Sequence, residues 1–167
     1  MIEFTRSNGC NVISLEVPGI LECRDMMLRT VSAACKLVIP KKRSRDTRYS
    51  EIISQIVSAV GEAYNNIVLH GYAGREPGTI HMRVENCSEW MRVIIRDTGA
   101  SFDPSQAPAP NLEALPESGL GIFIMRSFMD EVTYVCGPPN VLTLFKRLDA
   151  RDGRAINSVK IPDSGES

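Results

Sequence analysis

The segment from Asp46 to His70 has the most regular apolar pattern in the chain. Its apolar side chains recur three, four or seven positions apart, which places them on one face of a helix. Gly71 follows and is expected to end the helix. The pattern therefore predicts a long helix with one buried stripe, formed by Ile52, Ile53, Ile56, Val57, Val60 and Ile67.

The residues before this helix predict a hairpin and a first helix. Asn8-Gly9 is a turn signal, and Val12 to Val17 alternates apolar and polar side chains, as expected for an N-terminal hairpin. From Ile20 to Leu37 the apolar residues return to helical spacing, until Pro40 stops the pattern.

The residues after the long helix predict strands, a loop and one more helix. Residues 79–87 and 90–97 have the patterns of two adjacent antiparallel strands. Residues 102–117 contain four prolines and predict a long loop with little regular structure. A helix over residues 121–129 and a hairpin over residues 132–147 are expected to complete the fold.

Composition predicts one domain without a strong electrostatic preference. A chain of 167 residues, 43% of them hydrophobic, can form one core and is too short for two domains. We expect the domain at residues 1–148 and a polar tail at 149–167. Nineteen basic and twenty acidic residues give a net charge of -1, so no overall field favours direct binding of nucleic acid or an anionic membrane.

Two further patterns bear on location and on metal sites. No apolar stretch approaches the roughly 20 residues that span a bilayer, and no basic-then-apolar leader opens the chain, so we expect a cytoplasmic protein. The five cysteines are an odd set without CxxC spacing, so neither a zinc site nor a disulfide framework is expected. The basic run Lys41 to Arg45 is interpreted as a solvated loop, with contact to phosphate or an acidic protein as the alternative.

Glu62 and Asn66 are the first candidate site residues. They stand four positions apart on the long helix, so their side chains project from the same face one turn apart. A carboxylate can deprotonate an attacking hydroxyl, and a carboxamide oxygen is a hard ligand suited to Mg²⁺. An ordinary exposed polar pair is the alternative, and for this pair taken alone it is favoured, because a Glu four residues before an Asn is common.

Two later segments carry the other candidates. Asp97 ends an apolar strand, where a carboxylate can accept a hydrogen bond from an exocyclic amine such as that of adenine, and Gly99 permits close approach of the backbone. An Asp that simply opens a turn is the alternative. Gly119 and Gly121 precede a helix, whose first N–H groups favour phosphate.

These three segments, in this order, resemble a known family. Residues 60–72 (VGEAYNNIVLHGY) resemble the N-box of the GHKL ATPases, in the version carried by anti-sigma-factor serine kinases of the RsbW and SpoIIAB type. Residues 97–103 (DTGASFD) resemble the first glycine box of that family. Residues 118–121 (SGLG) and 128–132 (FMDEV) resemble the second box and its sequel.

The resemblance implies a fold and a set of residue roles. The fold is α+β, a two-layer sandwich in which helices cover one face of a mixed, mostly antiparallel sheet. Glu62 would be the general base, Asn66 the Mg²⁺ ligand and Asp97 the partner of the adenine amine. The remaining ATP-binding positions implied are Gly99, Ser101, Gly119, Leu120 and Gly121. Ser101 stands where the superfamily usually has Gly and kinases of the RsbW type commonly have Ser.

The resemblance also implies an activity and partners. It implies an ATP- and Mg²⁺-dependent serine/threonine protein kinase that binds a sigma factor or similar regulator and phosphorylates a STAS-domain antagonist. Arg29 resembles a position that contacts partner proteins, although a solvated surface Arg is an equal interpretation. A homodimer is left open. The alternatives are an ATP-gated binding module without kinase activity and, less favoured, a histidine-kinase catalytic domain.

Overall fold

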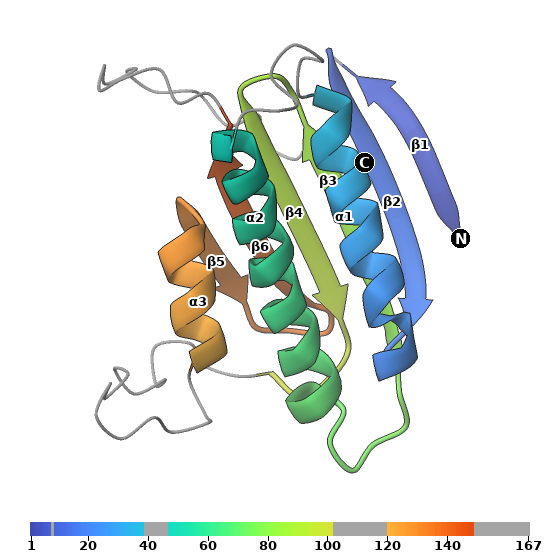
Figure 1. Ribbon diagram of the computed structural model, residues 1–167. Helices are drawn as coiled ribbons and strands as arrows, with labels where there is room; N and C mark the ends of the chain where they lie inside the picture. The colour runs from blue at the N-terminus through green and yellow to red at the C-terminus, as the bar shows by residue number, and fades with distance from the viewer. Residues whose placement is uncertain (8, 39–46, 102–119, 149–167) are drawn as a thin grey trace, which may run out of the picture.

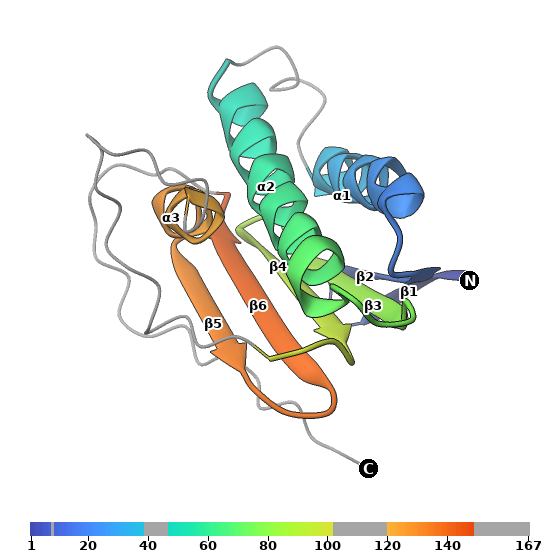
Figure 2. The same cartoon turned by 90° about the horizontal axis from the view of Figure 1, so that it is seen from below.

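The structure is a computed structural model that describes residues 1–7, 9–38, 47–101 and 120–148. These residues form a six-stranded sheet of strand order β1-β2-β3-β4-β6-β5. Figures 1 and 2 show that the helices all lie on one face of this sheet. The strands are β1 (Ile2–Ser7), β2 (Cys10–Pro18), β3 (Thr79–Asn86), β4 (Trp90–Asp97), β5 (Glu131–Val135) and β6 (Asn140–Arg147).

The helical layer follows the order expected from the sequence. Its elements are the 3₁₀ turn η1 (Leu21–Cys23), α1 (Arg24–Val38), α2 (Thr47–Asn66), the π-helical turn η3 (Ile67–Gly71) and α3 (Leu120–Phe128). None of the described helices is long and apolar enough to cross a membrane. The predicted loop at 102–117, the basic run at 41–45 and the tail at 149–167 lie outside the described residues.

The predicted α+β fold is confirmed, with one refinement. Every pairing in the described sheet is antiparallel, where we expected a mixed sheet. The connection from β2 to β3 explains why these two strands pair antiparallel. The chain passes along α1 and returns along α2, so it enters β3 in the direction opposite to β2 (Figure 1).

The apolar stripe of α2 packs against the sheet as predicted. Ile56 and Val60 are fully buried, and Ile67 is nearly so. The other three stripe residues are partly buried against the same core. Removal of this much apolar surface from water is the main stabilisation available to a two-layer fold. The core therefore lies between α2 and the central strands.

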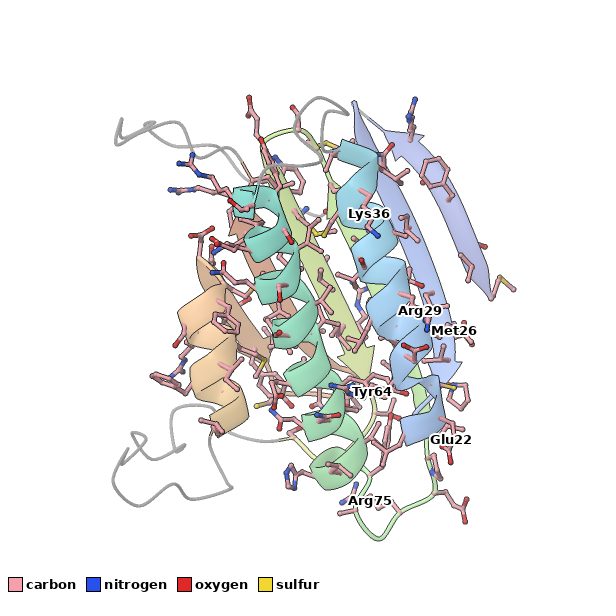
Figure 3. The ribbon with its side chains drawn as sticks, viewed as in Figure 1. Glu22, Met26, Arg29, Lys36, Tyr64 and Arg75 are labelled. Carbon is pink, nitrogen blue, oxygen red and sulfur yellow. A yellow bond between two sulfur atoms is a disulfide. The ribbon has the colours of Figure 1, made fainter. Side chains whose placement is uncertain are left out.

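Tyr64 joins the end of α2 to the segment between β2 and η1. Its hydroxyl donates to the carbonyl oxygen of Ile20 at 2.7 Å, and its side chain is fully buried. Burial raises the pKa of the Tyr64 phenol to about 12. Figure 3 shows this side chain on α2, close to the first turn of α1. The contact sets the position of the last turns of α2, which carry the candidate site residues.

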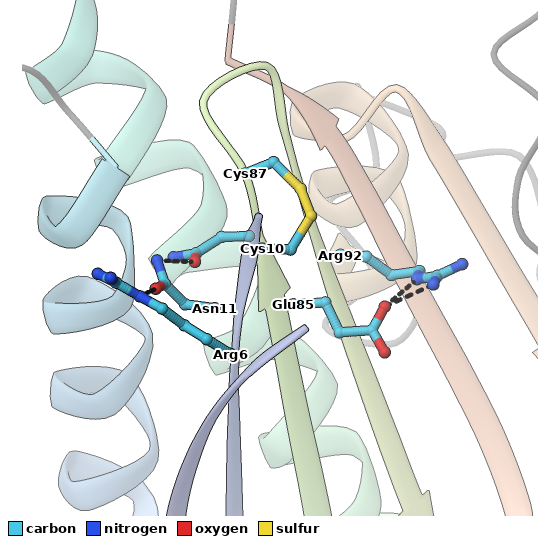
Figure 4. Close-up of a disulfide and its surroundings, with 7 residues drawn as sticks. Arg6, Cys10, Asn11, Glu85, Cys87 and Arg92 are labelled. Carbon is cyan, nitrogen blue, oxygen red and sulfur yellow. Dashed lines mark hydrogen bonds and ion pairs between the residues drawn. A yellow bond between two sulfur atoms is a disulfide. The ribbon is translucent and has the colours of Figure 1, made fainter. Parts of the chain in front are cut away.

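One disulfide corrects the expectation from the cysteine count. Cys10 and Cys87 are bonded, with their Cα atoms 4.6 Å apart (Figure 4). The antiparallel register of β2 and β3 pairs Asn11 with Asn86, which places the two cysteines opposite each other at the next position. Their separation of 77 residues hides this proximity in the sequence. The sequence analysis, which expected no disulfide framework, therefore missed this bond.

Reduction of this disulfide is expected to lower the free energy of unfolding by about 4 kcal/mol, because the bond closes a long loop in the unfolded chain. Urea denaturation with and without a reductant measures the difference. The Cys10→Ser, Cys87→Ser double variant should have the stability of the reduced protein and should not respond to the reductant, whereas Cys136→Ser should still respond to it. Equal stability of the oxidised and reduced protein would contradict the prediction.

Glu85, Arg83 and Arg92 form a charged cluster on the face of the sheet that no described helix covers. The carboxylate of Glu85 accepts hydrogen bonds from Arg83 Nε at 2.7 Å and from Arg92 Nε at 2.8 Å. Arg92 also lies over the ring of Trp90. Burial alone would raise the pKa of Glu85, but the hydrogen bonds and charges of the two arginines together lower it below its ordinary 4.5.

The lowered pKa predicts a loss of stability in acid. A carboxylate with a depressed folded-state pKa stabilises the fold fully above its ordinary pKa, and this contribution disappears as the pH falls through the folded-state value. Glu85→Gln should therefore reduce the fall in urea midpoint between pH 7 and about pH 3. Glu131→Gln, at an exposed position of the same sheet, is the control. An unchanged pH dependence in Glu85→Gln would contradict the role of the cluster.

Candidate nucleotide-binding site

The side chains of Glu62 and Asn66 converge on the start of α3. A Cβ placed on Gly121 would lie 3.0 Å from Glu62 Oε2 and 3.4 Å from both polar atoms of the Asn66 carboxamide. Both side chains are half-buried. The shared face predicted from their spacing is therefore present, and glycine at 121 leaves room between α2 and α3 beside these polar groups.

Asn65 lies on a different side of α2. Its Oδ1 accepts a hydrogen bond of 2.9 Å from Arg24 Nε, on the first turn of α1. This agrees with a position 100° around the helix from Asn66. Of the two adjacent asparagines, only Asn66 faces Gly121.

The end of β4 is docked on the end of α2. The amide of Ala100 donates to the carbonyl oxygen of Gly71 at 2.7 Å. A Cβ on Gly99 would lie 2.9 Å from the carbonyl carbon and oxygen of Gly71, so only glycine fits without movement of the backbone. The π-helical turn η3 carries Gly71 to this contact. Figures 1 and 2 show that the last turns of α2 lie between the end of β4 and the start of α3, toward one end of the molecule.

Asp97 is buried at this junction, with 4% of its surface exposed. Its Oδ1 accepts a hydrogen bond from the amide of Gly99 at 2.8 Å and another from Asn140 Nδ2 at 3.0 Å. The first bond is the turn contact that the alternative interpretation of Asp97 proposes. The second comes from a strand that the sequence analysis did not connect with the site.

Asn140 is the residue of this junction that the sequence analysis missed. It is fully buried at the start of β6 and also bonds to the carbonyl oxygen of Gly99 and the hydroxyl of Ser101. The sequence analysis counts it as the last residue of the hairpin turn Gly137-Pro138-Pro139-Asn140, where an Asn is common. Its burial and its contact with Asp97 come from the pairing of β4 with β6, which no local pattern contains.

The four remaining predicted residues lie in different surroundings. Ser101 is exposed, and its hydroxyl donates to Asn140. Leu120 is the first residue of α3 and is 41% exposed. Gly119 lies outside the described residues. On α1, the side chain of Arg29 is 81% exposed and forms an ion pair with Asp25.

Comparison with known proteins places this geometry in a family. The family model described as "Histidine kinase-like ATPase domain" matches residues 28–146, which include all three motif segments. This chain belongs to that family. Membership of a histidine kinase-like ATPase family implies that the chain binds ATP.

Two curated relatives are similar to this ATPase domain. The anti-sigma F factor of Halalkalibacterium halodurans is 32% identical over 108 residues, which are 62% of this chain and 74% of the relative. The anti-sigma F factor of Clostridium novyi is 35% identical over 86 residues, which are 49% of this chain and 60% of the relative.

The residues of the ATPase domain fit ATP and Mg²⁺. Glu62 and Asn66 offer oxygen atoms beside a glycine whose missing Cβ leaves space, and carboxamide and carboxylate oxygens suit a hard cation. The N-terminus of α3 lies at the same place and favours phosphate. Asp97 is a buried acceptor for an amine.

A hollow of about 660 Å³ lies elsewhere on the ATPase domain. Its lining includes Arg83, Arg96 and His81, on the face of the sheet opposite the helices. Asp97 reaches its edge, but Glu62, Asn66 and Gly121 do not line it. The polar groups that suit a nucleotide and Mg²⁺ lie instead on α2, at the end of β4 and at the start of α3.

Proposed function

We propose that this ATPase domain is a serine/threonine protein kinase and anti-sigma factor of a partner-switching system. It binds a sigma factor or similar regulator and phosphorylates a STAS-domain antagonist. The convergence of Glu62 and Asn66 on Gly121 carries the proposal, because a site that only binds nucleotide needs no base beside the metal ligand. The anti-sigma F factors among its relatives support the choice of partner.

The proposed mechanism assigns one role to each side chain. Glu62 accepts the proton of the attacking Ser or Thr hydroxyl, and the carboxamide of Asn66 would hold Mg²⁺. Asp97 binds the adenine amine, and Gly99 packs beside the base. Gly119, Leu120 and Gly121 contribute backbone at the phosphates. When bound, Mg·ATP supplies the phosphoryl group and a cation that offsets charge in the transition state.

The proposed partner surface is the outer face of α1. Figure 3 shows Met26, Arg29 and Lys36 on this helix, and all three are exposed. The ion pair of Arg29 with Asp25 is a surface pair four residues apart, which contributes little to stability. Arg29 can therefore exchange Asp25 for an acidic group of a partner at small cost.

We further propose that the protein acts in the cytoplasm, with a homodimer as its proposed assembly. Cytosolic thiol buffers normally keep cysteines reduced, so the Cys10–Cys87 disulfide of the structure would form in that compartment only under oxidising conditions.

An affinity capture with and without Mg·ATP tests the proposed function. The captured proteins and their phosphorylation sites are identified by mass spectrometry. We expect a sigma factor, and a STAS-domain protein that becomes phosphorylated on Ser or Thr only when ATP is present. A partner that binds in an ATP-dependent way but never carries phosphate would replace the kinase with the non-catalytic binding module.

A further inference from the structure

The geometry points to Asn140 as a positioning residue that makes the site select adenine, because it orients the carboxylate of Asp97. This inference rests on the proposed ATP site and assigns a specificity role to a residue on β6 that none of the three sequence motifs contains. Asn140 stands directly opposite Asp97 in the register of β4 and β6, and its side chain is fully buried.

The hydrogen bonds of Asn140 determine which way its carboxamide faces. Its Oδ1 accepts from the backbone amide of Gly137 at 3.2 Å, and a backbone amide can only donate. Its Nδ2 donates to the carbonyl oxygen of Gly99 at 3.1 Å, and a carbonyl can only accept. The reversed amide would lose both bonds. The Nδ2 group therefore has to face Asp97.

This orientation determines how Asp97 can meet a ligand. The hydrogen bonds from Asn140 and from the amide of Gly99 both end on Asp97 Oδ1. No bond from the described residues ends on Oδ2, so Oδ2 is the acceptor that remains for a ligand. A base with an amino group at this point donates to it. A base with a carbonyl there would place two acceptors together in a buried site.

A purely structural role explains only part of this network. A buried Asn could serve just to hold the turn before β6, and its bond to Gly137 does so. Its other three bonds leave the turn and reach Asp97, Gly99 and Ser101. Three of the four hydrogen bonds of Asn140 therefore reach the segment that contains the proposed base-binding residues.

A matched pair of variants separates the two roles. Asn140→Thr and Asn140→Val have nearly the same shape and suit a strand, but only Thr keeps a hydroxyl that can donate to Asp97. Calorimetry on the full chain would measure the affinities for ATP, for GTP and for the triphosphate of purine riboside, which lacks the 6-amino group. The ratio of the ATP affinity to the purine riboside triphosphate affinity reports the contact with Asp97.

We expect Asn140→Val to lower this affinity ratio about 10-fold relative to wild type, mainly because its affinity for ATP falls. Asn140→Thr should retain most of the wild-type ratio. The inference would be overturned if Asn140→Val bound both nucleotides more weakly by the same factor, or if Asn140→Thr and Asn140→Val had equal affinity ratios.

Two controls complete the test. Asn86→Val removes another buried Asn, which bonds to Asn11 away from the site, and should lower stability without changing the nucleotide ratio. If Asn140→Val does not fold, the ratio in Asn140→Thr and in Asn140→Ser against wild type decides the inference. If the wild-type chain binds ATP no better than GTP, the adenine site itself fails. If it binds ATP selectively and the variants keep that selectivity, only the role of Asn140 fails.

Discussion

Glu62→Ala is expected to slow phosphate transfer about 100-fold or more, because a positioned general base typically contributes 10²- to 10⁴-fold. ATP affinity should remain within about a factor of 3, since the base acts on the hydroxyl of the protein substrate and not on the nucleotide. Transfer of radiolabelled γ-phosphate to the antagonist measures the rate, and calorimetry measures the affinity. This combination would separate a catalytic carboxylate from one that only lines the site.

Two controls accompany Glu62→Ala. Glu62→Gln keeps the size of the side chain beside Gly121 and removes only its basicity, so it should be about as slow as the alanine variant. Glu51→Ala removes an exposed glutamate from the first part of the same helix and should transfer phosphate normally. Wild-type rates in Glu62→Ala would show that the base lies elsewhere.

Asn66→Ala is expected to weaken the binding of Mg·ATP about 10- to 100-fold, because a lost polar contact with a charged group is worth roughly 1.5–3 kcal/mol. ATP binding in the presence of a chelator should change much less, since the carboxamide is assigned to the cation. Calorimetric titrations with and without Mg²⁺ measure both affinities.

Asn65→Ala is the matched control for this variant. The two asparagines are adjacent on α2, but Asn65 is bonded to Arg24 and only Asn66 faces Gly121. Asn65→Ala should therefore bind Mg·ATP normally. An equal loss in both variants would indicate damage to the end of α2, and an unchanged affinity in Asn66→Ala would remove the metal role.

Local patterns predicted most of the fold correctly. The alternation from Val12 to Val17, the Asn8-Gly9 turn and the stripe of α2 are short-range signals, because one strand or one helix turn decides which side chains share a face. The structure contains the hairpins and helices that these signals predicted, with boundaries shifted by a few residues. The motif order also identified the family correctly before the comparison with relatives.

Long-range pairing explains what the sequence analysis missed. Cys10 and Cys87, and likewise Asp97 and Asn140, are far apart in the chain and become neighbours only through the register of two strands. Register depends on how whole strands align, and a shift of one residue would move each side chain to the other face of the sheet. No spacing within a single element contains that information.

The amino-acid sequence thus determined which residues share a face of each helix and strand, and which of them have the chemistry of an ATP site. Only the tertiary structure decided that Glu62 and Asn66 meet Gly121 across two helices and that Asn140 orients Asp97. The physical reason is the range of the interactions. Periodicity and side-chain chemistry are properties of neighbouring residues, whereas a buried hydrogen bond between β4 and β6 exists only after the core has packed and the strands have aligned.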